Sequence, residues 1–281
     1  MAASSLPTQP QLKRTGLKPV LPHEHGAWFI LYCPLLLGYA VSGFRSSACM
    51  ALLALAATGL FLLREPAELW MRGRKSRGTL LWGIVYLLLA AAGGIPLLLS
   101  RQNHGLLGTA LTGMLLFLLH GRLAANRRQD RSLAGELVGT SALTLTAPAA
   151  YMVGTGSVSA AAAALWGACI LFYSSSVFSV RLYLAAARAK KEWSPAVKQR
   201  IVRSSVFYHL LLSIALLAAD TAMAIPAALW LSLAFLPAIV RGFATIQKLT
   251  PAVPVLKKVG MREAALSLWF TIAFTAGMHF L

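Results

Sequence analysis

The chain has 281 residues, of which 58% are hydrophobic and 12% are charged, and its formal net charge is +18. No soluble globular protein could bury this much apolar surface, so the composition excludes that class and places the surplus against lipid. The basic residues lie in short breaks between apolar runs, so the charge reports membrane topology and does not indicate nucleic-acid binding.

The first 20 residues are rich in Ser, Pro, Gln and Lys and lack hydrophobic periodicity. We expect residues 1–20 to form a flexible cytoplasmic tail and residues 21–281 a single transmembrane domain. The rival interpretation is a cleaved signal peptide ending near Ala40. The long segment before the apolar run, and the continuation of that run to Phe44, argue against it.

Nine apolar segments have the length of a membrane-crossing helix. They are 26–44, 47–63, 79–99, 105–120, 137–153, 158–180, 204–219, 222–240 and 264–281. The boundary near Asp220 is the least marked, but fusing its two segments would give a run too long for one span. The sequence therefore predicts an all-α, multi-pass transmembrane bundle of about nine spans.

All but two of the 26 lysines and arginines, the exceptions being Arg45 and Arg101, lie in the tail or in the breaks after the second, fourth, sixth and eighth segments. Because cytoplasmic loops retain positive charge, we expect a bacterial cytoplasmic-membrane protein with its N-terminus in the cytoplasm and its C-terminus outside. Any chemistry should then lie within the membrane or at its inner face.

An arginine recurs at the cytoplasmic end of each even-numbered segment: Arg64, Arg122, Arg181 and Arg241. This regularity suggests that segments one to four and five to eight form two related halves. The alternative is that these arginines only snorkel to the membrane surface. The three cysteines occur singly in apolar runs, so we interpret them as small core residues.

Two imidazoles and a carboxylate, from His23, Glu24 and His25, directly precede the first span, and Trp28 follows them. A role in proton exchange or hydrogen bonding fits the trio better than a metal site, because residues two apart on a helix point in different directions. The alternative is an interfacial anchor, with Trp28 in the aromatic belt.

Two carboxylates accompany five cations after the second span, where we expect Pro66 to end or redirect the helix beyond Glu65. Glu65 and Glu68 can share one helical face. The cations from Arg74 to Arg77 are interpreted as a basic loop that meets anionic lipid, whereas Arg64 and Glu65 lie nearer the membrane and are candidates for function.

Glu136 starts the fifth segment, and this close to lipid it should face the bundle and pair with an arginine such as Arg131 or Arg127. Arg181 and Arg188 are seven residues apart and would share a face of a helix. His209 is interpreted either as a hydrogen-bonded core residue or as part of a site.

These positions predict one polar pocket at the inner face. His25 would cap it, and Arg64, Glu65, Arg122, Glu136, Arg181 and His209 would line it. His23, Glu24, Trp28 and Tyr183 complete the candidate ligand-binding set, and the catalytic candidates are His25, Glu65, Glu136 and His209. We expect no metal and no cofactor.

The strings His23 to Trp28, Arg64-Glu65-Pro66, Gly135-Glu136-Leu137 and Arg181-Leu182-Tyr183 resemble the YwiC-like family of bacterial membrane proteins. The layout of nine spans, with polar motifs after the second and sixth, is also similar to UbiA-type membrane prenyltransferases.

The UbiA resemblance implies aspartate-rich motifs that hold magnesium against a diphosphate. This chain has arginine and glutamate in those places, which argues against magnesium-dependent prenyl transfer.

Three functions stay open. The first is binding of an isoprenoid- or quinone-like molecule with a polar or anionic head group at the inner face, with or without an enzymatic step. The second is transport of a small solute or ion, which His25, Glu136 and His209 would support. The third is an accessory role in a respiratory complex, where a haem would need His209, His120 or His279. Membrane lipids are the partners we expect, and the oligomeric state is open.

Overall fold

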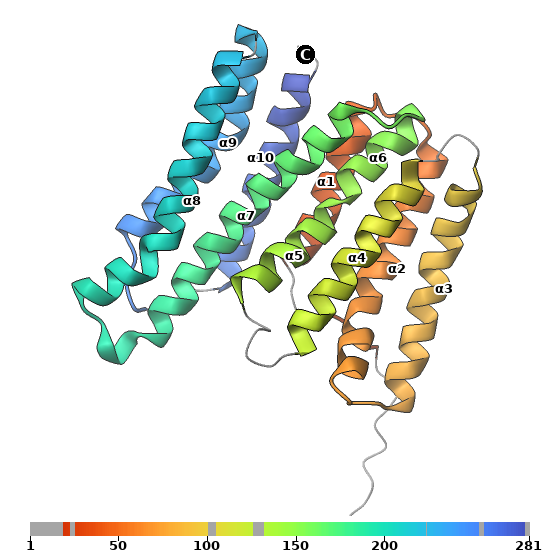
Figure 1. The fold of residues 1–281 in the computed structure, drawn as a ribbon, viewed down its shortest axis with the longest axis horizontal. Coiled ribbons are helices and arrows are strands. Elements are labelled where there is room, and N and C mark those ends of the chain that lie inside the picture. The colour runs from red at the N-terminus through yellow and green to blue at the C-terminus, as the bar shows by residue number, and fades with distance from the viewer. Residues whose placement is uncertain are drawn as a thin grey trace, which may run out of the picture.

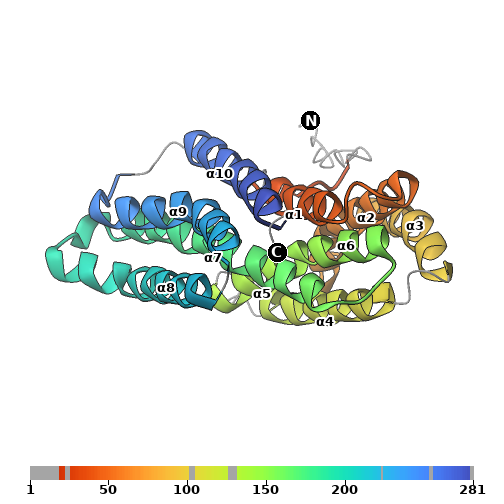
Figure 2. The same cartoon turned by 90° about the horizontal axis from the view of Figure 1, so that it is seen from above.

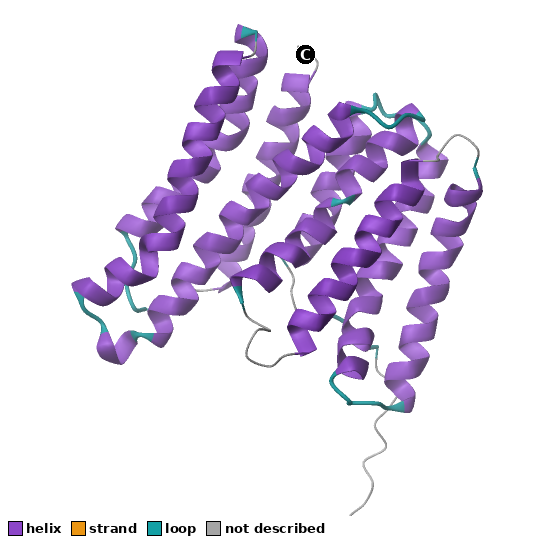
Figure 3. Ribbon diagram, viewed as in Figure 1, coloured by secondary structure: helices purple, strands orange, loops and turns teal. Residues whose placement is uncertain are grey.

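The computed structural model describes residues 19–22, 26–100, 105–125, 132–222, 224–252 and 256–278. Within these residues the chain is built of helices, with no strand (Figure 3). The helices are α1 (Ala27–Val41), α2 (Ser47–Met71), α3 (Arg77–Leu99), α4 (Gly105–Ala125), α5 (Leu133–Thr144), α6 (Thr146–Thr155), α7 (Ala160–Arg188), the short 3-10 helix η1 (Lys190–Glu192), α8 (Pro195–Ala222), α9 (Ile225–Gln247) and α10 (Leu256–Met278).

Seven helical segments in the described part of the chain are long and apolar enough to cross a membrane. Six of them lie in α2, α3, α4, α7, α8 and α9, and the seventh is α5 and α6 together. The structure therefore confirms an all-α, multi-pass membrane protein. The count of nine stays a prediction, because α1 has only 15 residues and α10 is not among the seven.

The expected fifth span is broken at Leu145 into α5 and α6. Pro148, in the first turn of α6, has no N–H to donate to the carbonyl of Thr144, and its ring crowds that carbonyl. The hydroxyl of Thr146 donates instead to the carbonyl of Leu31 in α1, at 2.8 Å. The break thus attaches this span to α1.

The prediction that Pro66 ends the second helix is wrong, because α2 continues through it to Met71. The alternative, that Pro66 redirects the helix, stays a prediction. Pro66 is buried, and its ring lies opposite Gly83 of α3, where there is room for it. Beyond the proline, Glu68 accepts hydrogen bonds from Arg64 and Arg72 one turn to either side, so side chains join the helical turns that flank the missing backbone bond.

Helices extend well beyond the apolar runs at one end of the bundle, here called the basic end, where α2, α7 and α9 finish and α3, α8 and α10 begin (Figure 1). The expected spans stopped at residues 63, 180 and 240, whereas these three helices reach Met71, Arg188 and Gln247. Arg64, Arg181 and Arg241 therefore lie within helices, where they can pair with neighbouring helices.

The helices form two groups around α1 and α6 (Figures 1 and 2). α2, α3 and α4 lie on one side, and α7, α8, α9 and α10 on the other. α1 crosses α6 closely, because a Cβ on Gly38 would lie 2.1 Å from the carbonyl oxygen of Ala147. On the other side, the rings of Phe172, Phe235 and Phe270 pack together and join α7, α9 and α10.

The packing of α2 on α3 gives a stability prediction. A Cβ on Gly93 would lie 2.3 Å from the carbonyl oxygen of Leu52, whereas a Cβ on Gly108 of α4 would meet nothing within 4 Å. We expect Gly93→Ala to destabilise the protein by about 1–3 kcal/mol through overpacking. Gly108→Ala should be neutral or stabilising by up to about 1 kcal/mol, because alanine favours the helix.

The measurement is the thermal unfolding midpoint of each variant in the same mild detergent. Equal midpoints for the two variants would show that α2 and α3 are not in close contact at Gly93.

Candidate ligand-binding site

The first polar group at the basic end is the Glu68 cluster, made of Glu68, Arg64, Arg72 and His120. Glu68 accepts from the Arg64 Nε at 2.9 Å and lies 3.4 Å from both Arg72 Nη2 and His120 Nε2. The other ring nitrogen of His120 lies 3.1 Å from the carbonyl oxygen of Gly135. The Glu68 side chain is only 12% exposed. Its contact with His120, and the contact of His120 with Gly135, join α2 to α4 and α5.

The second polar group is the ion pair between Glu136 and Arg181, with Arg181 Nη1 2.9 Å from the carboxylate. It joins the start of α5 to α7. Glu136 was expected to pair with Arg131 or Arg127, which lie outside the described residues. Both side chains of the observed pair are 34% exposed, so water screens the attraction and the pair contributes little to stability.

The third polar group is the Arg241 cluster, made of Arg241, Glu263, Ser175, Ser176 and His209. The guanidinium of Arg241 on α9 pairs with Glu263 on α10 and donates to Ser175 and Ser176 on α7. His209 on α8 lies 3.1 Å from the Ser175 hydroxyl through Nε2. Four helices therefore meet at one buried charge, since Arg241 is only 6% exposed.

Ser175 and His209 have the contacts of a nucleophile and its base. His209 Nδ1 lies 2.8 Å from the carbonyl oxygen of Ser205, which fixes its proton there and leaves Nε2 to accept from Ser175. Both side chains are fully buried, so no substrate can reach them in this conformation. The pair serves here as a polar link between α7 and α8.

An apolar groove, here called the α7–α8 groove, opens between α7 and α8 over α9 and α10, and has a volume of about 700 Å³. In Figure 1 the two helices diverge away from the basic end. The groove walls are small residues, including Ala160, Ala164 and Gly167 on α7 and Ala215 and Ala219 on α8. Its floor includes Phe235 and Phe274.

The groove ends close to the Arg241 cluster. Leu171 and Leu212 line it, and each lies about one helical turn along its own helix from Ser175 or His209. Below this point α7 and α8 touch through the stacked rings of Phe178 and Tyr208, whose centroids are 4.4 Å apart. An apolar space therefore adjoins a buried charged cluster.

The other predicted site residues lie apart from one another. Trp28 packs its ring against Phe61 in a small aromatic cluster between α1 and α2. The hydroxyl of Tyr183 lies 3.3 Å from that of Thr245 on α9. Arg122 is exposed in the last turn of α4, and Glu65 is partly buried on α2. The described candidates are thus spread over several places at the basic end.

His23, Glu24 and His25 lie outside the described residues, so the cap expected from them stays a prediction. The same holds for His279. For the other two haem-ligand candidates, His120 and His209, both ring nitrogens already face hydrogen-bonding partners. Across the described ranges no three His, Cys, Asp or Glu side chains come together as a metal site would require.

Sequence reasoning did not select Glu68, Ser175, Ser176, Arg241 or Glu263 as site residues, and it considered His120 only as a haem ligand. Arg241 did stand out as the fourth of the recurring arginines. Glu263 precedes the expected ninth span, 264–281, by one residue. A rule that pairs each near-membrane arginine with a near-membrane acid would have found Arg241 and Glu263.

Burial of the two ion pairs predicts unequal effects on stability. Arg241→Gln removes the buried cation from Glu263 and leaves it only the exposed Arg262, and we expect a loss of about 3 kcal/mol. Glu136→Gln removes an exposed pair and should cost less than about 1 kcal/mol. Thermal unfolding in detergent compares them, with Arg200→Gln, at an exposed arginine of α8, as a surface control.

The double variant Arg241→Met with Glu263→Met should regain part of the loss, because neither charge is then left alone. Similar losses for Arg241→Gln and Glu136→Gln would contradict the burial of the Arg241 cluster.

Comparison with known proteins gives one positive finding. The family of YwiC-like proteins matches residues 21–151, which include α1 to α5 and most of α6. No curated protein and no solved structure matches the chain. The match contains the Glu68 cluster and Glu136 and ends before the α7–α8 groove and the Arg241 cluster. Residues 21–151 are therefore similar to the YwiC-like family, which the motifs from His23 to Leu137 resemble.

Proposed function

We propose that this protein binds a lipophilic, isoprenoid- or quinone-like molecule. The apolar chain of the ligand lies in the α7–α8 groove, and its polar or anionic head group turns toward the basic end. The observation that carries the proposal is the groove itself, an apolar space of about 700 Å³ that ends beside a buried guanidinium.

The volume of the groove supports a ligand. A space of this size lies in the range of small-molecule sites, which are mostly apolar with a few polar groups. Most of the residues that α7 and α8 contribute to its walls are alanine or glycine, which leave the space between the two helices unfilled.

The polar end of the groove supports a head group there. Ser175, His209 and Arg241 lie near the end at which Leu171 and Leu212 line the wall. The opposite end is lined by Ala160, Ala219 and Met278. An amphiphilic ligand therefore gains most when its polar head lies toward the basic end.

The proposal includes the membrane arrangement. We propose nine spans in a UbiA-like bundle of two related halves, in a bacterial inner membrane, with the basic end in the cytoplasm. α1 counts as a span because it has to run away from the basic end for α2 to return to it (Figure 1). The location of the basic residues supports the orientation.

Filling the groove tests the ligand. Tryptophan at Ala164 or Ala215 occupies the space between α7 and α8, and both positions line the groove and are exposed within it. We expect the amount of isoprenoid or quinone that co-purifies to fall about tenfold in Ala164→Trp and in Ala215→Trp. This fall corresponds to a loss of about 1.4 kcal/mol in the free energy of binding. The measurement is mass spectrometry of lipids that co-purify from the native membrane.

The matched control is Ala110→Trp, an exposed alanine of α4 outside the groove. It adds the same ring at a surface of the other helix group and should leave the co-purified lipids unchanged. Equal lipid profiles in all four proteins, with unchanged unfolding midpoints, would refute the groove as a binding site.

Reporter fusions test the orientation. A fusion after Gly73, in the α2–α3 connection, should be active only as a cytoplasmic reporter, and one after Leu281 only as a periplasmic reporter. The same reporter active at both positions would contradict nine spans.

A further inference from the structure

A second hollow lies at the basic end, beyond the Phe178–Tyr208 stack that closes the α7–α8 groove. It has a volume of about 170 Å³ and lies where α7 meets the start of α8. Arg181, Arg188 and Ser204 provide its polar lining, and Phe178, Leu182 and Ile201 its apolar lining. This space is separate from the groove, because aromatic rings fill the seam between them.

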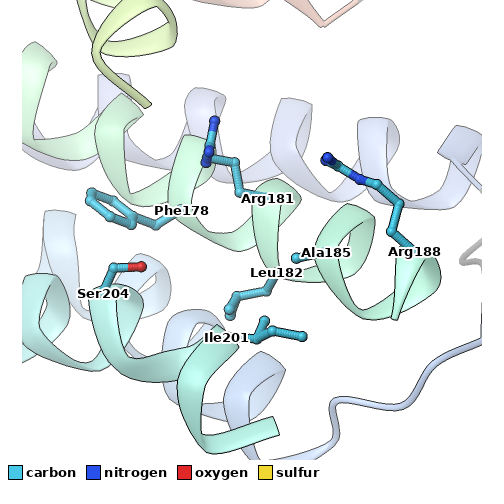
Figure 4. A pocket seen from close by; sticks show the side chains of 7 residues that line it. All are labelled: Phe178, Arg181, Leu182, Ala185, Arg188, Ile201 and Ser204. Atoms are coloured by element: carbon cyan, nitrogen blue, oxygen red, sulfur yellow. The ribbon is translucent and has the colours of Figure 1, made fainter. Parts of the chain in front are cut away.

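Two arginines that line the hollow, Arg181 and Arg188, lie on the same helix, α7. Figure 4 shows Arg181 and Arg188 extending from the same side of α7, as their separation of seven residues predicts. Arg188 is exposed and uses its Nε for the carbonyl of Leu184 in its own helix, at 3.1 Å. Within the described part of the chain its two terminal nitrogens have no hydrogen-bonding partner.

The surrounding charge favours an anion. Between residues 181 and 203 the chain carries seven cations, Arg181, Arg188, Lys190, Lys191, Lys198, Arg200 and Arg203, and one acid, Glu192. Glu136, on α5, neutralises part of the charge of Arg181, but no described carboxylate pairs with Arg188. The net field at this corner is therefore strongly positive, and it concentrates anions there.

We infer that this hollow binds a phosphate monoester group. A guanidinium presents planar paired donors that match phosphate oxygens, and a phosphate monoester carries close to two negative charges near neutral pH, which suits two arginines better than a carboxylate does. Ser204 adds a hydroxyl donor from α8. Phe178, Leu182 and Ile201 can contact the first carbons of an attached chain.

The phosphate can belong to a lipid head group or to a free phosphate compound, and binding of three probes separates the two sources. The probes are inorganic phosphate, dihexanoyl phosphatidic acid and, as a zwitterionic control, dihexanoyl phosphatidylcholine. They are titrated calorimetrically into the full chain in a non-ionic detergent. We expect phosphatidic acid to bind and phosphatidylcholine not to bind.

Arg188→Gln should weaken phosphatidic acid binding about tenfold, because it removes one of two charge-assisted donors. Arg188→Lys should lose most of this affinity too, since lysine keeps the charge without the planar fork. Arg200→Gln removes an exposed cation that does not line the hollow and should change the affinity less than twofold. Arg188 makes one bond within its own helix, so its variants should unfold at the wild-type temperature.

The outcomes separate cleanly. A matching tenfold loss for inorganic phosphate supports a site for free phosphate, and a loss confined to phosphatidic acid supports a lipid head group. Equal losses in Arg188→Gln and Arg200→Gln, wild-type binding by Arg188→Lys, or equal binding of the two lipids would each overturn the site. Isoprenoid or quinone retention in Arg188→Gln reports on the α7–α8 groove independently.

Discussion

The hydrocarbon core of a bilayer offers no water to a polar group, and we attribute to that constraint the pairing of acidic with basic side chains at the basic end. The carboxylates of Glu68, Glu136 and Glu263 each lie against an arginine of the basic end. Arg241, the most buried of these arginines, donates hydrogen bonds to Ser175 and Ser176 on α7 and to Glu263 on α10. Elsewhere single polar side chains bond to backbone carbonyls, as Thr146 does to Leu31.

The same constraint shapes the α7–α8 groove. α7 and α8 are joined near the basic end, where Ser175 meets His209 and Phe178 stacks on Tyr208. Beyond these contacts their facing residues are mostly alanine and glycine, which are too small to fill the space as the helices diverge. The Ser175–His209 contact and the Phe178–Tyr208 stack thus lie between the apolar groove on one side and the basic hollow on the other.

The two helix groups differ in the features that they carry. α2 and α3 pack through Gly59 and Gly93 so closely that no space for a ligand remains between them. α7 to α10 contain the α7–α8 groove, the basic hollow and the buried Arg241 cluster. The YwiC-like match covers the first group together with α1, α5 and most of α6, so the proposed binding functions belong to the part of the chain beyond it.

The sequence by itself determined the class of protein, because hydropathy and segment length reflect the transfer of whole helices into lipid and need no knowledge of their neighbours. It also located the polar end of the bundle, where Arg64, Arg181 and His209 were expected to matter. It did not give the ends of α2, α7 and α9, since a helix continues past the membrane wherever its side chains find partners, as Arg64 does with Glu68.

Only the tertiary structure decided which charges pair. Arg241 and Glu263 are 22 residues apart and Glu136 and Arg181 are 45 apart, so neither pair leaves a local pattern in the sequence. The groove could not be predicted from the sequence either. Alanines leave a space between helices that diverge, but they also let parallel helices come into contact. The crossing of α7 and α8 decides between these two results, and the buried bond between Ser175 and His209 helps to hold the two helices where they cross.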